Sequence, residues 1–236
     1  NGNTGYILNN QLVDETVLKT SGIGAESAAD GAEVNMIPKE GGNTFSGVIN
    51  GLYTTDRLQN QNLNDALRDR GLMDANRILK IYDLGASVGG PIKRDKLWFF
   101  GSIRRWGNAH QNAGIYWNAT QGTLFWSPDL DRPGDREQWY RSNAARVTWQ
   151  ASPRNKFNFF GDFARTCICR SGGGQSTPPE TVTGYEFRKS GSGFAPPHGI
   201  YQASWNMPVT TRVLLEAGAG YAVLDWPYFI EPGVSL

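Results

Sequence analysis

Hydrophobic and polar residues alternate over several short stretches of the chain. In residues 81–90, IYDLGASVGG, apolar side chains occupy every second position, and polar residues or glycine fill most of the positions between them. A period of two over this length predicts a β-strand with one apolar face. Related patterns recur along the chain and predict about seven strands in all. The other stretches are residues 44–54, 96–106, 143–150, 156–164, 199–206 and 212–224.

The connections between these strands alternate in length. Short turns are predicted near residues 90–96, 152–156 and 206–211, and long connections at about 55–79, 107–138 and 167–197. Short turns at one end of a sheet and long connections at the other are typical of outer-membrane β-barrels, whereas a soluble β-sandwich seldom pairs them so regularly. We therefore predict an all-β fold: part of an antiparallel, up-and-down transmembrane β-barrel. Consecutive strands should pair as neighbours, and strands 44–54 and 212–224 should be open edges.

The same alternation assigns residues to the two faces of the sheet. The apolar set should lie on the convex, lipid-facing surface and comprises Tyr82, Leu84, Val88, Val147, Trp149, Tyr201, Trp205, Leu215 and Tyr221. The polar set should lie on the concave surface and comprises Asp83, Arg146, Gln202 and Glu216. Because side chains alternate strictly along a strand, an error of one residue in register would exchange the two sets.

Composition narrows the class of protein. The chain has 236 residues and a formal net charge of +1, which gives no electrostatic reason to expect a nucleic-acid partner. No apolar run approaches the roughly 18 residues of a transmembrane helix. The 29 glycines and the aromatic content of 12% suit many short strands and turns.

A basic turn stands directly before three aromatic residues in GGPIKRDKLWFF, residues 89–100. In a membrane-spanning strand this order occurs at the boundary between lipid headgroups and hydrocarbon. We expect Lys93 and Arg94 to lie in water on the periplasmic side. Trp98 and Phe157 should belong to an aromatic girdle.

The N-terminal part of the chain carries a family resemblance. Residues 14–43 contain two short strand patterns, near 16–19 and 34–37, and are followed by TFSGVINGLY. This stretch resembles the end of the plug domain and the first barrel strand of TonB-dependent outer-membrane receptors, in particular the subgroup with a carboxypeptidase-regulatory-like N-terminal domain. The residues that match the family pattern are Ser21, Gly22, Ile23, Ala25, Glu26, Gly31, Val34, Asn35, Ile37, Lys39, Gly41, Gly42, Asn43, Phe45 and Gly47. Ala28, Ala29 and Pro38 depart from it.

The resemblance implies an organisation and a function. Residues 1–43 would be the C-terminal part of a plug domain that lies against the concave face, and residues 44–236 the N-terminal portion of a transmembrane β-barrel; the chain would be an internal fragment. The whole protein would be an outer-membrane receptor that imports a scarce nutrient (a siderophore, vitamin, saccharide or peptide). Its partners would be outer-membrane lipid and a TonB-type energy-transducing protein, reached through the missing N-terminal part. No enzymatic activity and no cofactor are expected.

Candidate ligand-binding residues gather near the predicted outward ends of the strands. Aromatic side chains with arginine suit the capture of a sugar, peptide or chelate. The candidates are Arg104, Arg105, Trp106, Tyr116, Trp117, Trp126, Trp139 and Tyr140. Residues 62–79 have leucines at helical spacing before Gly71, which predicts a short helix in the first outward connection.

Two further motifs resemble metal sites, but in each an ordinary loop is the favoured interpretation. Cys167 and Cys169 could hold a soft metal, but two ordinary loop cysteines, or partners to cysteines outside this stretch, are the favoured explanation; a disulfide across one residue would need favourable geometry. DLDRPGDRE, residues 129–137, resembles a calcium loop, but Pro133 occupies a ligand position. No metal site and no catalytic arrangement is predicted.

A second function class fits the same pattern. A soluble all-β module that binds glycans or mediates adhesion would also display surface aromatic residues. Such a module should be monodisperse in plain buffer, whereas a membrane barrel should require detergent.

Overall fold

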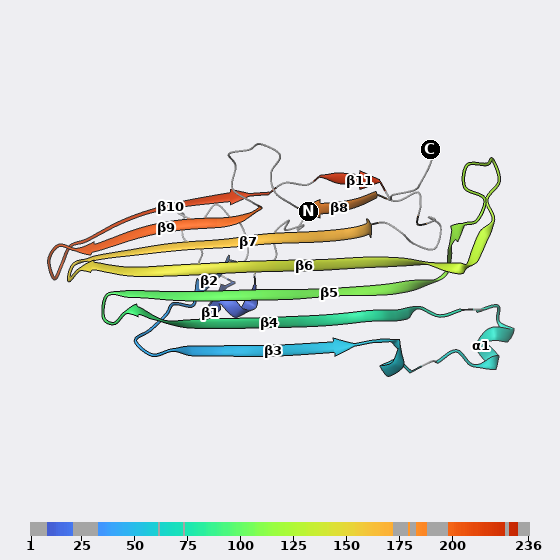
Figure 1. Cartoon of the computed structure of the whole chain (residues 1–236), viewed down its shortest axis with the longest axis horizontal. Helices are drawn as coiled ribbons and strands as arrows, with labels where there is room; N and C mark the ends of the chain where they lie inside the picture. Colours follow the sequence, from blue (N-terminus) through green and yellow to red (C-terminus); the bar gives the residue numbers. More distant parts are fainter. Residues whose placement is uncertain are drawn as a thin grey trace.

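An antiparallel sheet dominates the computed structural model, which describes residues 9–20, 33–60, 62–72, 74–171, 179, 183–187, 198–224 and 227–230. Seven strands follow one another in the order β10-β9-β7-β6-β5-β4-β3, as Figure 1 shows. Their bounds are β3 Ser46–Thr54, β4 Arg77–Lys93, β5 Leu97–Asn118, β6 Pro128–Ser152, β7 Asn155–Ser171, β9 Gly199–Pro208 and β10 Leu214–Val223. The fold is all-β and fits part of an up-and-down barrel, as the alternation predicts.

The strands pair with their neighbours in sequence, with one addition. β8 (Thr183–Phe187) pairs with the end of β7, at Thr166 to Ser171, and β11 (Tyr228–Ile230) pairs with β8. β9 pairs with the preceding part of β7, so β7 has two partners on one side. The predicted short turns are confirmed at residues 94–96, 153–154 and 209–213. Among the described strands, β3 and β10 end the seven-strand path, as predicted.

The central strands are longer than predicted. β5 has 22 residues and β6 has 25, whereas about 9 to 11 residues cross a bilayer. The predicted long connection at 107–138 is therefore wrong, because residues 107–118 and 128–138 extend these strands. Residues 107–118 mix small, apolar and polar side chains, and residues 128–138 are mostly polar or charged, so no sustained apolar alternation marks these extensions. β8 likewise lies within the predicted connection at 167–197.

The first outward connection contains two short helical turns. η2 spans Asp56–Leu58 and α1 spans Asp65–Asp69. The Asn64 side chain accepts a hydrogen bond from the Leu67 amide and so caps α1. Gly71 has a φ of +91°, which ends the helical segment where the sequence predicts it, although the helix is shorter than residues 62–79. No helix among the described residues is long and apolar enough to cross a membrane.

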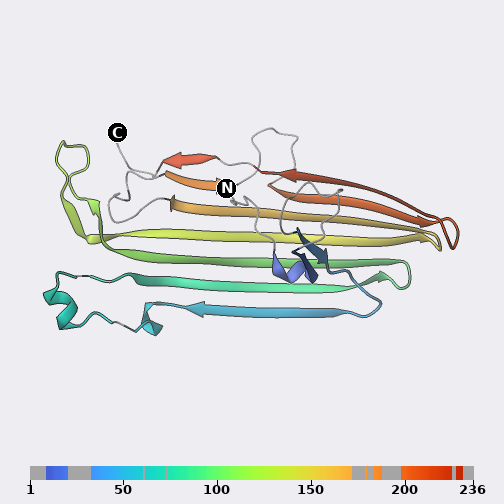
Figure 2. The ribbon, with the colours of Figure 1, turned by 180° about the vertical axis from the view of Figure 1, so that it is seen from behind.

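The N-terminal segment lies on one face of the sheet. β1 (Val13–Lys19) and β2 (Glu33–Pro38) form the predicted strand pair, preceded by the helical turn η1 (Asn10–Leu12). Figure 2 shows them in front of the sheet. Leu12 is 2% exposed and packs with Phe100, Ala144 and Phe160. We call this face of the sheet the inner face and the opposite one the outer face.

The register confirms that each predicted set of residues shares one face of the sheet. Paired residues in antiparallel strands point to the same side. Arg146 pairs with Phe160, and Phe160 with Gln202, so the polar set shares the inner face. The apolar set shares the outer face, where Ile49 is 87% exposed and Phe163 42%. Phe157 stacks on Trp149 there, with ring centroids 5.5 Å apart.

Trp98 differs from its prediction. It is paired with Thr148 and lies on the inner side, where its indole Nε1 donates to Asn43 at 2.8 Å. A bulge between Pro91 and Lys93 shifts the register next to it. The aromatic run therefore divides between the faces, and Phe99 rather than Trp98 points outward, where it packs with Phe45 at 6.3 Å.

Candidate functional site: the inner face and the outward connections

The GGN motif at residues 41–43 joins the N-terminal segment to the sheet. A Cβ atom at Gly41 would collide with the Phe99 carbonyl oxygen, so only glycine permits this approach. Asn43 accepts hydrogen bonds from the Asp95 amide at 2.9 Å and from Trp98 at 2.8 Å. The motif thus fixes where the chain leaves the inner face and enters β3.

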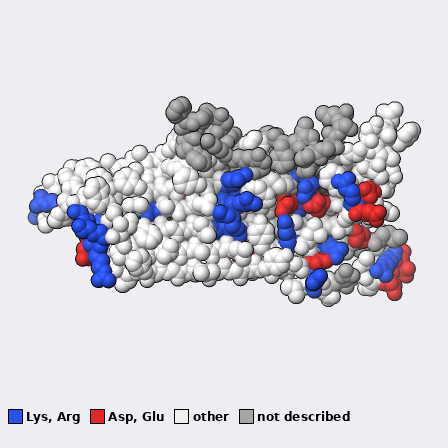
Figure 3. Space-filling view, in the orientation of Figure 1, with Lys and Arg blue, Asp and Glu red and all other residues white. Residues whose placement is uncertain are grey.

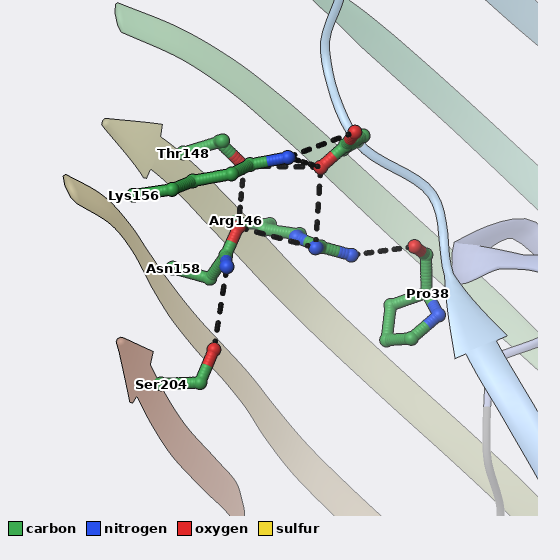
Figure 4. Close-up of polar contacts among 7 residues, drawn as sticks. Pro38, Arg146, Thr148, Lys156, Asn158 and Ser204 are labelled. Atoms are coloured by element: carbon green, nitrogen blue, oxygen red, sulfur yellow. Dashed lines mark hydrogen bonds and ion pairs between the residues drawn. The ribbon is translucent and has the colours of Figure 1, made fainter. Parts of the chain in front are cut away.

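An ionic cluster anchors the same connection to β6 and β7, as Figure 4 shows. Arg146 donates to the Pro38 carbonyl at 2.6 Å and lies 3.3 Å from the Glu40 carboxylate. Lys156 reaches the same carboxylate at 3.4 Å. Asn158 accepts from Thr148 at 3.1 Å and donates to Ser204 at 3.3 Å, which extends the cluster to β9.

A second polar contact lies at the start of the N-terminal segment. The side-chain amide of Asn9 donates hydrogen bonds to the hydroxyls of Ser102 at 3.0 Å and Ser142 at 3.1 Å. Ser142 in turn donates to Asp162 at 2.8 Å. Asn9, Ser142 and Asp162 are fully buried. Because buried polar groups are costly without partners, this chain of bonds places the segment specifically.

Three of the predicted ligand-binding residues come together on the inner face. Arg104 binds Asp83 through two hydrogen bonds, at 2.9 and 2.7 Å. Trp106 lies two residues further along β5 and packs against Tyr140, with ring centroids 5.8 Å apart. Tyr140 is fully buried.

The other five lie elsewhere. Arg105 and Trp139 point to the outer face, because β5 and β6 alternate. Tyr116 and Trp117 are at the far end of β5, where Arg132 stacks over the Trp117 ring at 4.7 Å. Trp126 lies between β5 and β6 and is 54% exposed. The predicted set therefore spans three separate surfaces.

The structure has a cavity in the first outward connection, between β3 and β4, which the sequence does not predict. It has a volume of about 370 Å³ and lies between η2, α1 and the start of β4. Gln59 donates to the Asn76 carbonyl at 3.0 Å and accepts from the Ile78 amide at 2.7 Å. Asp56 and Arg77 form an ion pair beside it. The only signal in the sequence is the density of amide side chains in LQNQNLN, residues 58–64.

Neither of the two motifs that resemble metal sites forms a loop in the structure. Cys167 and Cys169 form a disulfide and lie in β7 rather than in a loop. Residues 129–137 belong to β6, and Asp135 pairs with Arg170 at 2.6 Å. Among the described residues, no three His, Cys, Asp or Glu side chains gather as a metal site would require. Six residues of the family pattern lie outside the described residues: Ser21, Gly22, Ile23, Ala25, Glu26 and Gly31.

Comparison with known proteins relates part of the chain to one transporter. Over 93 residues it is 30% identical to the TonB-dependent transporter Oar of Myxococcus xanthus. The match covers 38% of this chain and 9% of that protein. No protein-family model matches the chain. No solved structure matches it either.

Proposed function

We propose that the chain is part of a TonB-dependent outer-membrane transporter. Residues 1–43 are the C-terminal part of its plug, and residues 44–236 are the N-terminal portion of its barrel. The similarity to a TonB-dependent transporter supports this proposal. So does the position of β1 and β2 against the polar inner face, which a plug must occupy.

The outer face carries the proposal. From Trp149 the outer positions of β6 are Val147, Ala145 and Asn143, and the row ends at Arg141. These positions span about 26 Å of strand at roughly 3.3 Å per residue, of the order of the apolar band of an outer-membrane barrel. Figure 3 shows a mostly uncharged surface between the short turns and a basic patch over the middle strands.

Beyond that patch the strands project outside the bilayer. There residues 128–138 of β6 are mostly charged or polar, and the outward connection with its cavity follows. A nutrient from outside (siderophore, vitamin, saccharide or peptide) first meets this end. We assign first capture to Tyr116, Trp117 and Trp126, and a deeper contact to Arg104 and Trp106 on the inner face. The buried Tyr140 packs against Trp106 and supports it. Arg105 and Trp139 are not assigned to the nutrient site because their side chains lie on the outer face of the sheet.

Fractionation tests the location. The protein, expressed at the length its gene encodes, should sediment with the outer membrane and stay monodisperse only in detergent. A monodisperse protein in plain buffer would overturn the proposal and favour a soluble glycan-binding module. The exposed apolar outer face argues against that alternative.

Uptake tests the mechanism. Cells carrying the protein should accumulate one member of a panel of labelled siderophores, cobalamin, oligosaccharides and peptides. Deleting the inner-membrane energy-transducing protein should abolish uptake while surface binding persists. Uptake that survives this deletion would mark a passive pore instead.

A further inference from the structure

Three arginines form a row across the outer face. Arg105 on β5 pairs with Arg141 on β6, and Arg141 pairs with Arg165 on β7. The pairing puts the three side chains next to one another on the outer face, and Figure 3 shows a basic patch midway along the strands. On the proposed orientation this row is the outer boundary of the apolar band.

The row holds concentrated positive charge. Arg105 donates to three neutral acceptors: the Arg104 carbonyl at 2.9 Å, and the Ser142 carbonyl and the Asn143 side chain, both at 2.8 Å. Arg141 is exposed and its guanidinium lies 4.6 Å from the centre of the Trp139 ring. In the part of the chain that the structure describes, neither of these two makes an ion pair. Because adjacent like charges on paired strands destabilise a sheet, an anion between them would be stabilising.

An apolar groove begins directly beside the row. It has a volume of about 540 Å³. Its lining includes the small residues Ala86, Gly101 and Ala145, the larger residues Ile49, Ile103 and Phe163, and the polar Asn143. Ile103 is two residues from Arg105, and Phe163 is two residues from Arg165. From Arg141 to Ala145 the strand covers about 13 Å, enough for the upper part of an acyl chain.

We propose that the arginine row and the groove together bind one phosphorylated lipid of the outer leaflet. The phosphate lies between Arg105 and Arg141, since guanidinium groups bind phosphate oxygens through paired hydrogen bonds. One acyl chain fills the groove over Gly101 and Ala145. The inference rests on the proposed membrane location. It assigns a lipid-binding role to Arg105, which the sequence had placed in the nutrient site.

Native mass spectrometry of the detergent-solubilised protein, at the length its gene encodes, tests the site. The probes are a bisphosphorylated acylated glucosamine disaccharide and the same lipid without phosphates. The double variant Arg105→Gln and Arg141→Gln should weaken binding of the phosphorylated probe by about thirtyfold, from the contribution of two arginines near a membrane surface. Arg154→Gln, in a short turn at the other end of the strands, is the matched control and should bind like the parent.

A second variant tests the groove without changing charge. A Cβ atom at Gly101 would have the Ala144 carbonyl oxygen at 3.9 Å as its nearest contact, so Gly101→Leu fits the backbone and fills the groove. It should weaken binding of the phosphorylated lipid several-fold. Unchanged binding in either variant, equal binding of the two lipids, or full competition by millimolar inorganic phosphate would overturn the inference. A protein that fractionates with the outer membrane but fails these tests refutes the lipid site alone, whereas a water-soluble protein refutes the proposed function.

Discussion

The guanidinium of Arg146 lies 3.3 Å from the carboxylate of Glu40, and this ion pair joins the N-terminal segment to β6. Arg146 also donates to the Pro38 carbonyl at 2.6 Å, so one side chain contacts two residues of the connection between β2 and β3. The Arg146 side chain is 16% exposed and that of Glu40 is 45% exposed. The segment is thus attached through polar contacts, which water can replace once they open. On the proposed function, this would let the segment rearrange during transport.

The first prediction concerns this attachment. Arg146→Gln should lower the free energy of local opening of β2 by about 1 kcal/mol, a value reduced for the solvent exposure of Glu40. Hydrogen exchange at the backbone amides of residues 34–37 should then accelerate about fivefold.

Lys156→Gln provides the control. Lys156 shares the Glu40 carboxylate but is 36% exposed, and it makes no hydrogen bond to the Pro38 carbonyl. Its effect on the same amides should be clearly smaller. Equal acceleration in the two variants would show that the Pro38 contact is unimportant.

The second prediction concerns pH in the first outward connection. The hydrogen bond from Arg77 holds the pKa of Asp56 below its ordinary value of 3.8. A carboxyl group with a lowered pKa stabilises the folded arrangement above its ordinary pKa, and this stabilisation is lost as pH falls through the folded value. The turn η2 should therefore be ordered at neutral pH and loosen only below about pH 4.

A nitroxide label on Leu58→Cys measures this loosening, since Leu58 is 76% exposed and tolerates a label. The label should become mobile as pH falls below 4, and the added variant Asp56→Asn should make it mobile at every pH. A label that stays equally immobile in the Asp56→Asn variant would contradict the role given to this ion pair.

The third prediction concerns the cysteines. Since Cys167 and Cys169 are joined, the purified protein should show no reactive thiol at these two positions after denaturation alone. Reduction before denaturation should release two thiols, counted by alkylation and peptide mass spectrometry. Two alkylated cysteines without reductant would contradict the disulfide.

The sequence predicts the half of the sheet near the short turns and misses the half beyond the arginine row. Strands such as 81–90 and 143–150 turn an exposed apolar row to the outer face and mostly polar or small side chains to the inner face, and this difference gives the period of two. Residues 107–118 mix small, apolar and polar side chains, and residues 128–138 are mostly charged or polar, so no sustained alternation distinguishes them from a loop. Their strand structure comes from pairing with each other, which a local pattern cannot show.

The sequence predicts which residue types lie near the candidate site, but it does not predict on which face of the sheet each side chain lies. Arg104 and Arg105 are adjacent in sequence, and strand alternation sends them to opposite faces. The sequence grouped them because both precede Trp106. The role of Trp98 was missed because a bulge next to it shifts the register, and bulges leave little trace in the pattern of side chains.

The last prediction tests which face meets lipid. Ala203 and Gln202 are neighbours on β9, and the register places Ala203 on the outer face and Gln202 on the inner face. Both are exposed in the sheet, so neither position is crowded. Ala203→Arg puts a charge into hydrocarbon one outer position inside the row of Trp149 and Trp205. It should lower the free energy of unfolding in lipid vesicles by about 1 to 2 kcal/mol, between the costs at the interface and at the midplane. Gln202→Arg replaces one polar side chain by another and should change the free energy of unfolding by less than about 1 kcal/mol.

Urea unfolding in vesicles, followed by tryptophan fluorescence, measures the free energy of unfolding of both variants. If the two variants lose equal stability, or if Gln202→Arg loses more, the assignment of the outer face to lipid is wrong, and the arginine row and groove on that face lose their lipid with it.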